Sequence, residues 1–305
     1  MKALILGGTK FMGVHLANTL LAANHDVTIA TRGKTPDPFG NKVTRLTIDR
    51  QDPTSLAAAF KNKHYDVTID NIAYASNDVK HLLDALHTTK YILTSTISVY
   101  ANNLHDNMLE EEVDTTTLPL KWCNYEDAPY DEAKRQAEAA LFQAYPGQLS
   151  AAVRFPYIFG NDDYTKRLFF YVEHIVRGRP MHVDNPTARL SFINSQEAGQ
   201  FLAHAATAPV SGYVNAASNG TITLEEIISY TEKRAAKKAI IMEDGAPATL
   251  NGVPSFGADT AKAASSGFQF QNIESWVYPL IDQWVHELQT TASAERNSHL
   301  NEEER

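Results

Sequence analysis

Short apolar segments alternate with helical patterns through the first half of this 305-residue chain. Six segments are predicted as strands: 3–6, 27–30, 43–48, 67–70, 91–95 and 149–155. The first of them, Ala3–Leu6, is a short apolar run suited to a strand buried on both faces. Apolar residues recur at helical spacing between them, at 11–21, 54–61, 79–87 and 126–145. This repeated β-α-β order predicts an α/β fold with a doubly wound parallel sheet, which binds its ligands at the carboxyl ends of the strands.

The alternation stops after the fifth strand. Residues 102–120 are polar and acidic, and they predict a long loop that is either a lid over a substrate or a solvated insertion. After Gly160 the pattern loosens into helices and short strands. The end of the chain is polar, and we expect residues 291–305 to form a disordered tail.

A glycine-rich segment, Gly7-Gly8-Thr9-Lys10-Phe11-Met12-Gly13, joins the first strand to the first helix. The free N–H groups and the positive dipole end at the start of a helix favour an anion. Gly7 suits a tight turn, and Gly13 suits close packing of the helix on the sheet. The segment lacks the G-x-G-x-x-G spacing and carries Lys10 at its centre. It predicts a site for a dinucleotide's phosphates, with a buried turn that binds no ligand as the alternative.

Tyr130 and Lys134 stand four residues apart on a predicted helix and therefore share a face. A nearby ammonium favours the phenolate and lowers the pKa of a tyrosine, so the pair can act as a general acid/base. An exposed Tyr–Lys pair with no function is the alternative. The stretch Leu93–Tyr100 ends a predicted strand with several hydroxyl groups, which could bind a substrate oxygen beside the tyrosine.

Composition narrows the classes of function. The chain is 43% hydrophobic and 21% charged, which is ordinary for a soluble protein, and its net charge of −9 disfavours a nucleic-acid partner. The single Cys123 suits a reducing cytoplasm. We expect no membrane span and no signal peptide, since no long apolar run is present and the first residues enter a strand. The histidines show no metal-binding spacing, so no metal is expected.

The order of four motifs, GGTKFMG, TSTISVY, YDEAK and RFPYIFG, resembles an extended or atypical short-chain dehydrogenase/reductase of the NAD-dependent epimerase/dehydratase type. A weaker resemblance continues through Arg189–Ile193 and Tyr213–Ser218. It implies a Rossmann-like dinucleotide-binding domain at 1–160, to which some later segments return, and a small C-terminal α/β substrate-binding region at 161–290. It also implies a homodimer that packs through the helices near 79–87 and 126–145.

The resemblance also implies roles for individual residues. Thr96, Tyr130 and Lys134 would be the catalytic set, with Lys134 lowering the pKa of the tyrosine and binding the nicotinamide ribose. Asp49 and Arg50 would lie on the adenine side of the cofactor. The full set of expected cofactor contacts is Gly7, Gly8, Thr9, Lys10, Phe11, Met12, Gly13, Arg32, Asp49, Arg50, Asn71, Ile72, Ala73, Thr94, Pro156 and Tyr157.

Two departures from the family pattern bear on cofactor and substrate. The second strand ends in Ala30–Lys34 without the carboxylate that grips the ribose 2′-hydroxyl in NAD-preferring proteins. Arg32 and Lys10 could instead meet a 2′-phosphate, so NADP is preferred over NAD, unless both cations are simply solvated. Tyr157 replaces the asparagine expected three residues after Arg154, which weakens the case for a nucleotide-sugar substrate.

These observations together predict an NAD(P)-dependent oxidoreductase, epimerase or dehydratase that acts by hydride transfer. Its substrate would be a sugar derivative or another carbonyl or alcohol compound. The alternative is an NAD(P)-binding regulatory or RNA-binding protein of the same fold, against which the acidic composition and the intact Thr96, Tyr130 and Lys134 set both argue.

Overall fold

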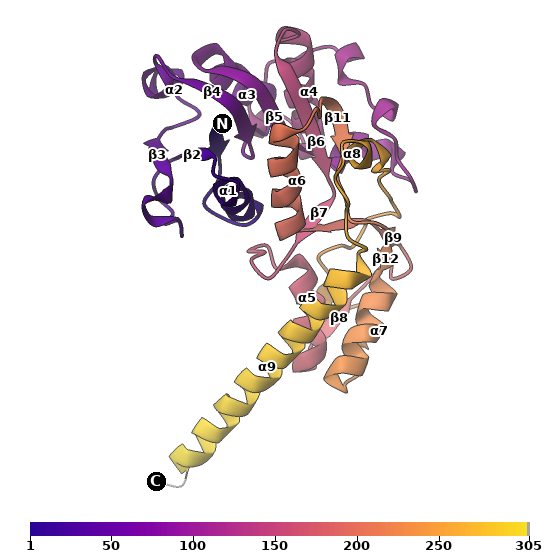
Figure 1. The fold of residues 1–305 in the computed structure, drawn as a ribbon. Coiled ribbons are helices and arrows are strands. Elements are labelled where there is room, and N and C mark those ends of the chain that lie inside the picture. The colour runs from indigo at the N-terminus through magenta and orange to yellow at the C-terminus, as the bar shows by residue number, and fades with distance from the viewer. Residues whose placement is uncertain (304–305) are drawn as a thin grey trace.

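The computed structural model describes the backbone of residues 1–303 and the side chains of residues 1–101 and 103–291. Its centre is a seven-stranded sheet in the order β11-β6-β5-β4-β1-β2-β3, and all neighbouring strands are parallel (Figure 1). The strands are β1 (Lys2–Leu6), β2 (Asp26–Thr31), β3 (Thr44–Thr47), β4 (His64–Asp70), β5 (His87–Thr96), β6 (Leu149–Phe155) and β11 (Gly212–Asn215). The predicted doubly wound α/β fold is confirmed.

Helices cover both faces of this sheet. They are α1 (Met12–Ala22) and α6 (Ser195–Thr207) on one face, and α2 (Pro53–Phe60), α3 (Ser76–Ala85) and α4 (Tyr130–Ala139) on the other (Figure 1). Alternate residues of β1 supply both cores, since Ala3 and Ile5 pack in the cluster with α1 and α6 while Leu4 and Leu6 pack in the cluster with α2, α3 and α4. Burial on both faces explains why β1 reads as a continuous apolar run.

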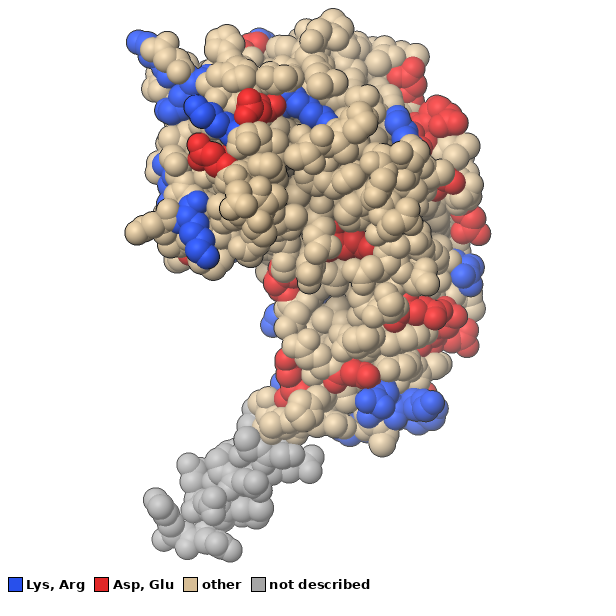
Figure 2. Space-filling model, in the orientation of Figure 1, with Lys and Arg blue, Asp and Glu red and all other residues tan. Residues whose placement is uncertain are grey.

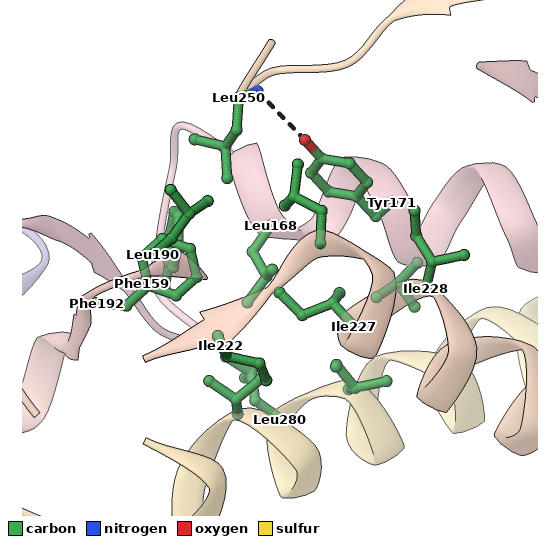
Figure 3. Close-up of a cluster of buried hydrophobic side chains, with 14 of the residues drawn as sticks. Phe159, Leu168, Tyr171, Leu190, Phe192, Ile222, Ile227, Ile228, Leu250 and Leu280 are labelled. Atoms are coloured by element: carbon green, nitrogen blue, oxygen red, sulfur yellow. Dashed lines mark hydrogen bonds between the residues drawn. The ribbon is translucent and has the colours of Figure 1, made fainter. Parts of the chain in front are cut away.

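The remaining elements form a smaller region beside the carboxyl ends of the strands. Its helices are α5 (Arg167–Arg177), α7 (Leu224–Ala235) and α9 (Glu274–Glu303), whereas α8 (Ala261–Ser265) packs beside β11 at the edge of the main sheet. Its short strands are β7 (Tyr157–Phe159), β8 (Pro180–His182), β9 (Arg189–Leu190), β10 (Phe192–Asn194), β12 (Ile222–Thr223), β13 (Ile240–Ile241) and β14 (Ala246–Pro247). Leu168, Ile227 and Leu280 bring α5, α7 and α9 together in one apolar core (Figure 3).

The chain path in the structure bears on three expectations. The helix expected at 126–145 begins at Tyr130, because Pro129 precedes it as the N-cap, and it ends in a π-helical turn at Ala140–Ala144. β11, far along the chain, returns to the edge of the main sheet. A disordered tail is expected at 291–305, and the structure continues α9 through residues 291–303. Residues 304–305 of that tail lie outside the described part.

The polar stretch at 102–120 is packed against the sheet. It contains two short 3₁₀ turns, Glu110–Glu112 and Thr115–Thr117. Arg154 of β6 donates hydrogen bonds to the carbonyl oxygens of Glu110 (2.9 Å) and Val113 (2.7 Å). A fully buried guanidinium therefore anchors this segment to the sheet, although most of its described residues are exposed. None of the helices within the described residues is long and apolar enough to cross a membrane.

Candidate functional site

A cavity of about 920 Å³ opens at the carboxyl ends of the central strands. One wall comes from the ends of β1, β2, β4 and β5, and the opposite wall from the smaller region, including the first residue of α5. Such a crevice beside the point where the strand order reverses is the usual ligand site of doubly wound sheets. The cavity therefore lies at the carboxyl ends of the strands, where the sequence predicted a ligand site.

The glycine segment needs glycine at two positions for steric reasons. Gly7 has a φ of +79°, and a Cβ on it would lie 2.6 Å from Cγ2 of Ile72. A Cβ on Gly13 would lie 2.3 Å from the carbonyl oxygen of Gly7, so the start of α1 packs directly on the turn. Close backbone approach of this kind leaves room for a ligand over the turn. The segment lines the cavity through Gly7, Thr9, Lys10, Phe11, Met12 and Gly13, but not through Gly8.

An unpartnered amide faces the same cavity. Asn71 follows β4, and its Oδ1 accepts a 2.7 Å hydrogen bond from the Thr94 hydroxyl of β5. Its Nδ2 is buried and has no partner among the described residues. A buried polar group without a partner destabilises the fold by about 1–3 kcal/mol, which a polar ligand would offset. Together with the glycine cradle, this donor shows that the residues present fit a dinucleotide.

Two cations stand at the β2 end of the cavity. Lys10 and Arg32 are exposed, both line the cavity, and neither side chain has a hydrogen bond or ion pair within the described part of the chain. No carboxylate follows β2, where the segment reads Thr31-Arg32-Gly33-Lys34. On the face shown in Figure 2, Lys and Arg side chains predominate over the β2 and β3 side of the sheet, with some Asp and Glu among them. This end of the cavity therefore suits an anion.

Tyr130 projects from the first turn of α4 and lines the cavity with 40% of its surface exposed. Partial burial raises the pKa of its phenol to about 12, although a hydrogen bond with the Thr96 side chain acts in the opposite direction. The Thr96 hydroxyl at the end of β5 also accepts from the backbone N–H of Ser98 at 3.1 Å. Tyr130 and Thr96 are thus brought together as the sequence predicted, and the tyrosine is protonated at neutral pH.

Lys134 lies one turn further along α4 and is only 2% exposed. Its Nζ donates 2.8 Å hydrogen bonds to the carbonyl oxygens of Ala73 and Thr94 and stands 4.8 Å from the centre of the Tyr74 ring. Burial lowers the pKa of this ammonium to about 8. Burial is the largest influence on the pKa of Tyr130, and the Arg167 cation acts in the opposite direction by lowering it.

Several expected cofactor contacts do not reach the cavity. The Arg50 guanidinium is buried and pairs with Asp70 at 2.9 Å and with Asp78 at 3.2 Å. The Asp49 carboxylate accepts from the backbone N–H of Gln51. Ala73 contributes its carbonyl to Lys134 and, like Asp49 and Arg50, does not line the wall. Arg50 therefore links β4 to α3 instead of presenting its charge to a ligand.

Pro156 and Tyr157 line the cavity as expected, and so do Asn71, Ile72 and Thr94. Sequence analysis missed other parts of the wall, which are the aromatic side chains of Tyr74, Tyr125 and Tyr164 and the cation of Arg167. The Arg167 guanidinium lies 5.5 Å from the centre of the Tyr157 ring. No motif marks these residues: Tyr74 and Tyr125 lie in the loops before α3 and α4, and the place of Tyr164 and Arg167 depends on how the smaller region packs on the sheet.

The chain resembles known proteins in sequence and in structure. Residues 3–219 match the model of the NAD dependent epimerase/dehydratase family. A curated relative, chloroplast stem-loop binding protein of 41 kDa b from Arabidopsis thaliana, is 26% identical over 205 residues, which are 62% of this chain and 50% of the relative. This chain thus spans about half the length of that relative.

Solved structures support the same fold. A putative epimerase from Burkholderia cenocepacia J2315 is 19% identical, with a TM-score of 0.74 over 95% of this chain and 98% of that one. UDP-glucuronic acid 4-epimerase from Bacillus cereus, in complex with UDP-glucuronic acid and NAD, is 18% identical, with a TM-score of 0.74 over 94% of this chain and all (100%) of that one. The family match covers more than half of the sequence, so the chain belongs to the NAD dependent epimerase/dehydratase family.

Proposed function

We propose that this protein is an NAD(P)-dependent enzyme that interconverts an alcohol and a carbonyl group, either as a net reaction or within an epimerase or dehydratase cycle. The observation that carries the proposal is that Thr96, Tyr130 and Lys134 share one cavity with the glycine cradle. When bound, the dinucleotide supplies a nicotinamide ring that accepts a hydride or returns it. The substrate class that fits is a sugar derivative or another carbonyl or alcohol compound.

The side chains of the site would hold and move the proton. Because the pKa of Tyr130 is raised to about 12, its hydroxyl carries a proton that it can donate to a substrate oxygen as negative charge develops there. The Thr96 hydroxyl can donate a hydrogen bond to the same oxygen. An ammonium has three N–H donors, and Lys134 uses two on carbonyl oxygens, which leaves one for a hydroxyl group of the cofactor.

We further propose that the cofactor is NADP. Its 2′-phosphate would meet Arg32 and Lys10, which have no partner within the described residues, and the end of β2 lacks a carboxylate that would repel it. A charge-assisted hydrogen bond contributes about 1.5–3 kcal/mol, so Arg32→Ala should weaken NADPH binding roughly 10–100-fold and leave NADH binding nearly unchanged. Calorimetry with both nucleotides tests this, and Lys233→Met on the exposed side of α7 is the control. Equal or tighter binding of NADH by the wild type would refute the choice of NADP.

Catalysis is tested by Tyr130→Phe. The substitution removes the phenolic oxygen and keeps the ring, so turnover should fall roughly 10²–10⁴-fold while cofactor affinity stays the same. Tyr125→Phe, at the same cavity wall, is the matched control and should retain activity. A screen of sugar alcohols and carbonyl compounds, followed by cofactor absorbance, supplies the substrate. Full activity of Tyr130→Phe on that substrate would sink the assignment.

A second candidate function is binding of structured RNA, which the name of the chloroplast relative favours. The net charge of −9 argues against it, because phosphate contacts dominate nucleic-acid affinity. A gel-shift titration with a stem-loop RNA at physiological salt separates the two. Micromolar binding together with no turnover of any carbonyl or alcohol would favour the RNA-binding function.

We also propose a homodimer that packs through α3 and α4, the helices on one face of the sheet. Ala139 and Ala140 of the α4 region are buried already, so the contact would use the outward residues, including the exposed Trp122 beside α3. Light scattering at micromolar concentration tests the state, and a strict monomer would contradict it.

A further inference from the structure

The cavity wall has a charge distribution opposite to that of the whole chain. The chain carries a net charge of −9, yet the cavity lining among the described residues contains no Asp or Glu. It contains four cations instead: Lys10, Arg32, Lys134 and Arg167. The proposed cofactor accounts for the first three, since two meet its 2′-phosphate and one its ribose. Arg167 stands on the opposite wall and is left without a role.

Nothing in the described structure neutralises Arg167. The residue is partly buried at the start of α5, and its guanidinium has no hydrogen bond or ion pair with a described residue. Its only close ring contact is the face of Tyr157, at 5.5 Å. A partly buried cation without a counter-ion is unfavourable unless a ligand supplies the anion.

The carboxylates nearest in sequence are engaged elsewhere. Asp163 accepts from the backbone N–H and the hydroxyl of Thr165, at 2.8 and 2.6 Å. Asp162 accepts from the Ser195 hydroxyl at 2.6 Å and pairs with His15 at 3.0 Å. These contacts fix both carboxylates away from Arg167 and keep its guanidinium available to the cavity.

The other arginine near the substrate end cannot serve. Arg154, the first residue of the Arg154–Tyr157 stretch, is fully buried, pairs with Glu138 at 2.7 Å and bonds to Tyr100 at 3.0 Å. All of its donors are directed into the protein. Arg167 is thus the arginine of the described cavity wall whose guanidinium is available to a substrate beside Tyr130.

We propose that the substrate carries a compact oxyanion, a carboxylate or a phosphate group, which Arg167 binds and so directs the reacting oxygen toward Tyr130. The planar guanidinium presents parallel N–H donors that match two oxygens of such a group. The proposal rests on the proposed function and specifies its substrate class. Arg167 and Tyr130 line the same cavity, and the guanidinium acts to lower the pKa of the phenol.

Inorganic phosphate is the first probe. It is titrated by calorimetry into protein saturated with NADP⁺, whose own phosphates occupy the glycine segment. The wild type should bind phosphate saturably, Arg167→Met should bind it at least tenfold more weakly, and Arg167→Lys should fall between them. Lys166→Met is the matched control, because Lys166 is exposed, lies over Phe169 and does not line the cavity. No saturable binding, or equal binding by wild type and Arg167→Met, overturns the proposal.

Matched sugars then separate the two kinds of anion. Glucose 6-phosphate and glucuronate are compared with glucose, and at least one anionic sugar should bind about 10–100-fold more tightly than glucose to the wild type but not to Arg167→Met. No preference for either anionic sugar overturns the assigned substrate class. Failure of the proposed function has a different signature, namely no binding of NADP⁺ or NAD⁺. Phosphate is then titrated into the free protein, where a loss in Arg167→Met still supports the anion site and an unchanged affinity refutes it.

Discussion

Replacing Lys134 by methionine should remove a pH dependence of stability that arises from burial of the ammonium. Burial holds the pKa of Lys134 at about 8 in the folded protein, against 10.5 in the unfolded chain. Between these values the unfolded chain binds more protons than the folded one. The free energy of unfolding therefore rises as the pH increases from 8 to 10.5, and this contribution is lost as the pH falls.

The size of the effect follows from the two pKa values. One pKa unit corresponds to about 1.4 kcal/mol, so the full shift is worth roughly 3 kcal/mol. About 2 kcal/mol of this lies between pH 7.5 and pH 10, the range that is convenient for measurement. Tyr130, with a pKa of about 12, has the opposite sign and acts mainly above pH 10, so it leaves this window clear.

Urea unfolding of the wild type and of Lys134→Met at several pH values from 7.5 to 10 measures the difference. The wild type should gain about 2 kcal/mol relative to the variant across this range. Lys233→Met, on the exposed side of α7, is the control and should follow the wild type. If wild type and Lys134→Met show the same slope within about 0.5 kcal/mol, the buried ammonium is not the source of the pH dependence.

Two further substitutions test the cradle and the buried ion pair. Gly13→Ala places a Cβ 2.3 Å from the Gly7 carbonyl oxygen, so it should reduce cofactor affinity at least tenfold in calorimetry. The control is Gly147→Ala, whose Cβ meets nothing within 4 Å and which should bind the cofactor normally. Normal affinity of Gly13→Ala would contradict the packing argument. Arg154→Met leaves the Glu138 carboxylate buried without its partner and should lower the free energy of unfolding in urea by about 3–5 kcal/mol. The double variant with Glu138→Met should recover most of this stability. A double variant that is less stable than Arg154→Met would refute this account.

The centre of the sheet could be predicted from sequence because its inner strands are buried on both faces, unlike the mostly exposed edge strand β3. The segment 91–95 reads as a continuous apolar strand, and the structure extends it to His87–Thr96 as β5. The glycine segment was equally informative, since steric demands of Gly7 and Gly13 are local. Local rules cannot place β11, which is four residues long and is a strand only because it pairs with β6.

Charged residues were harder to interpret, because their partners are distant in the sequence. Arg50 follows a strand and resembled a cofactor residue, but Asp70 and Asp78, which engage it, lie 20 and 28 positions away. Arg154 was recognised as part of a motif, yet its burial against Glu138 and the 102–120 segment is a property of the packed structure. Arg167 belongs to no motif and faces the cavity only because α5 packs where it does.

The Tyr130–Lys134 pair shows how far spacing alone can carry a chemical argument. The four-residue separation correctly predicted that both side chains line one cavity. It did not predict that two carbonyl oxygens would engage the ammonium, nor that burial would raise the pKa of the phenol and lower that of the lysine. Desolvation disfavours the charged form of both groups and is the largest cause of both shifts. The free protein thus holds a protonated tyrosine suited to acid catalysis on a carbonyl, and removal of a proton from an alcohol requires a bound oxidised cofactor, whose positively charged ring favours the phenolate, to change that balance.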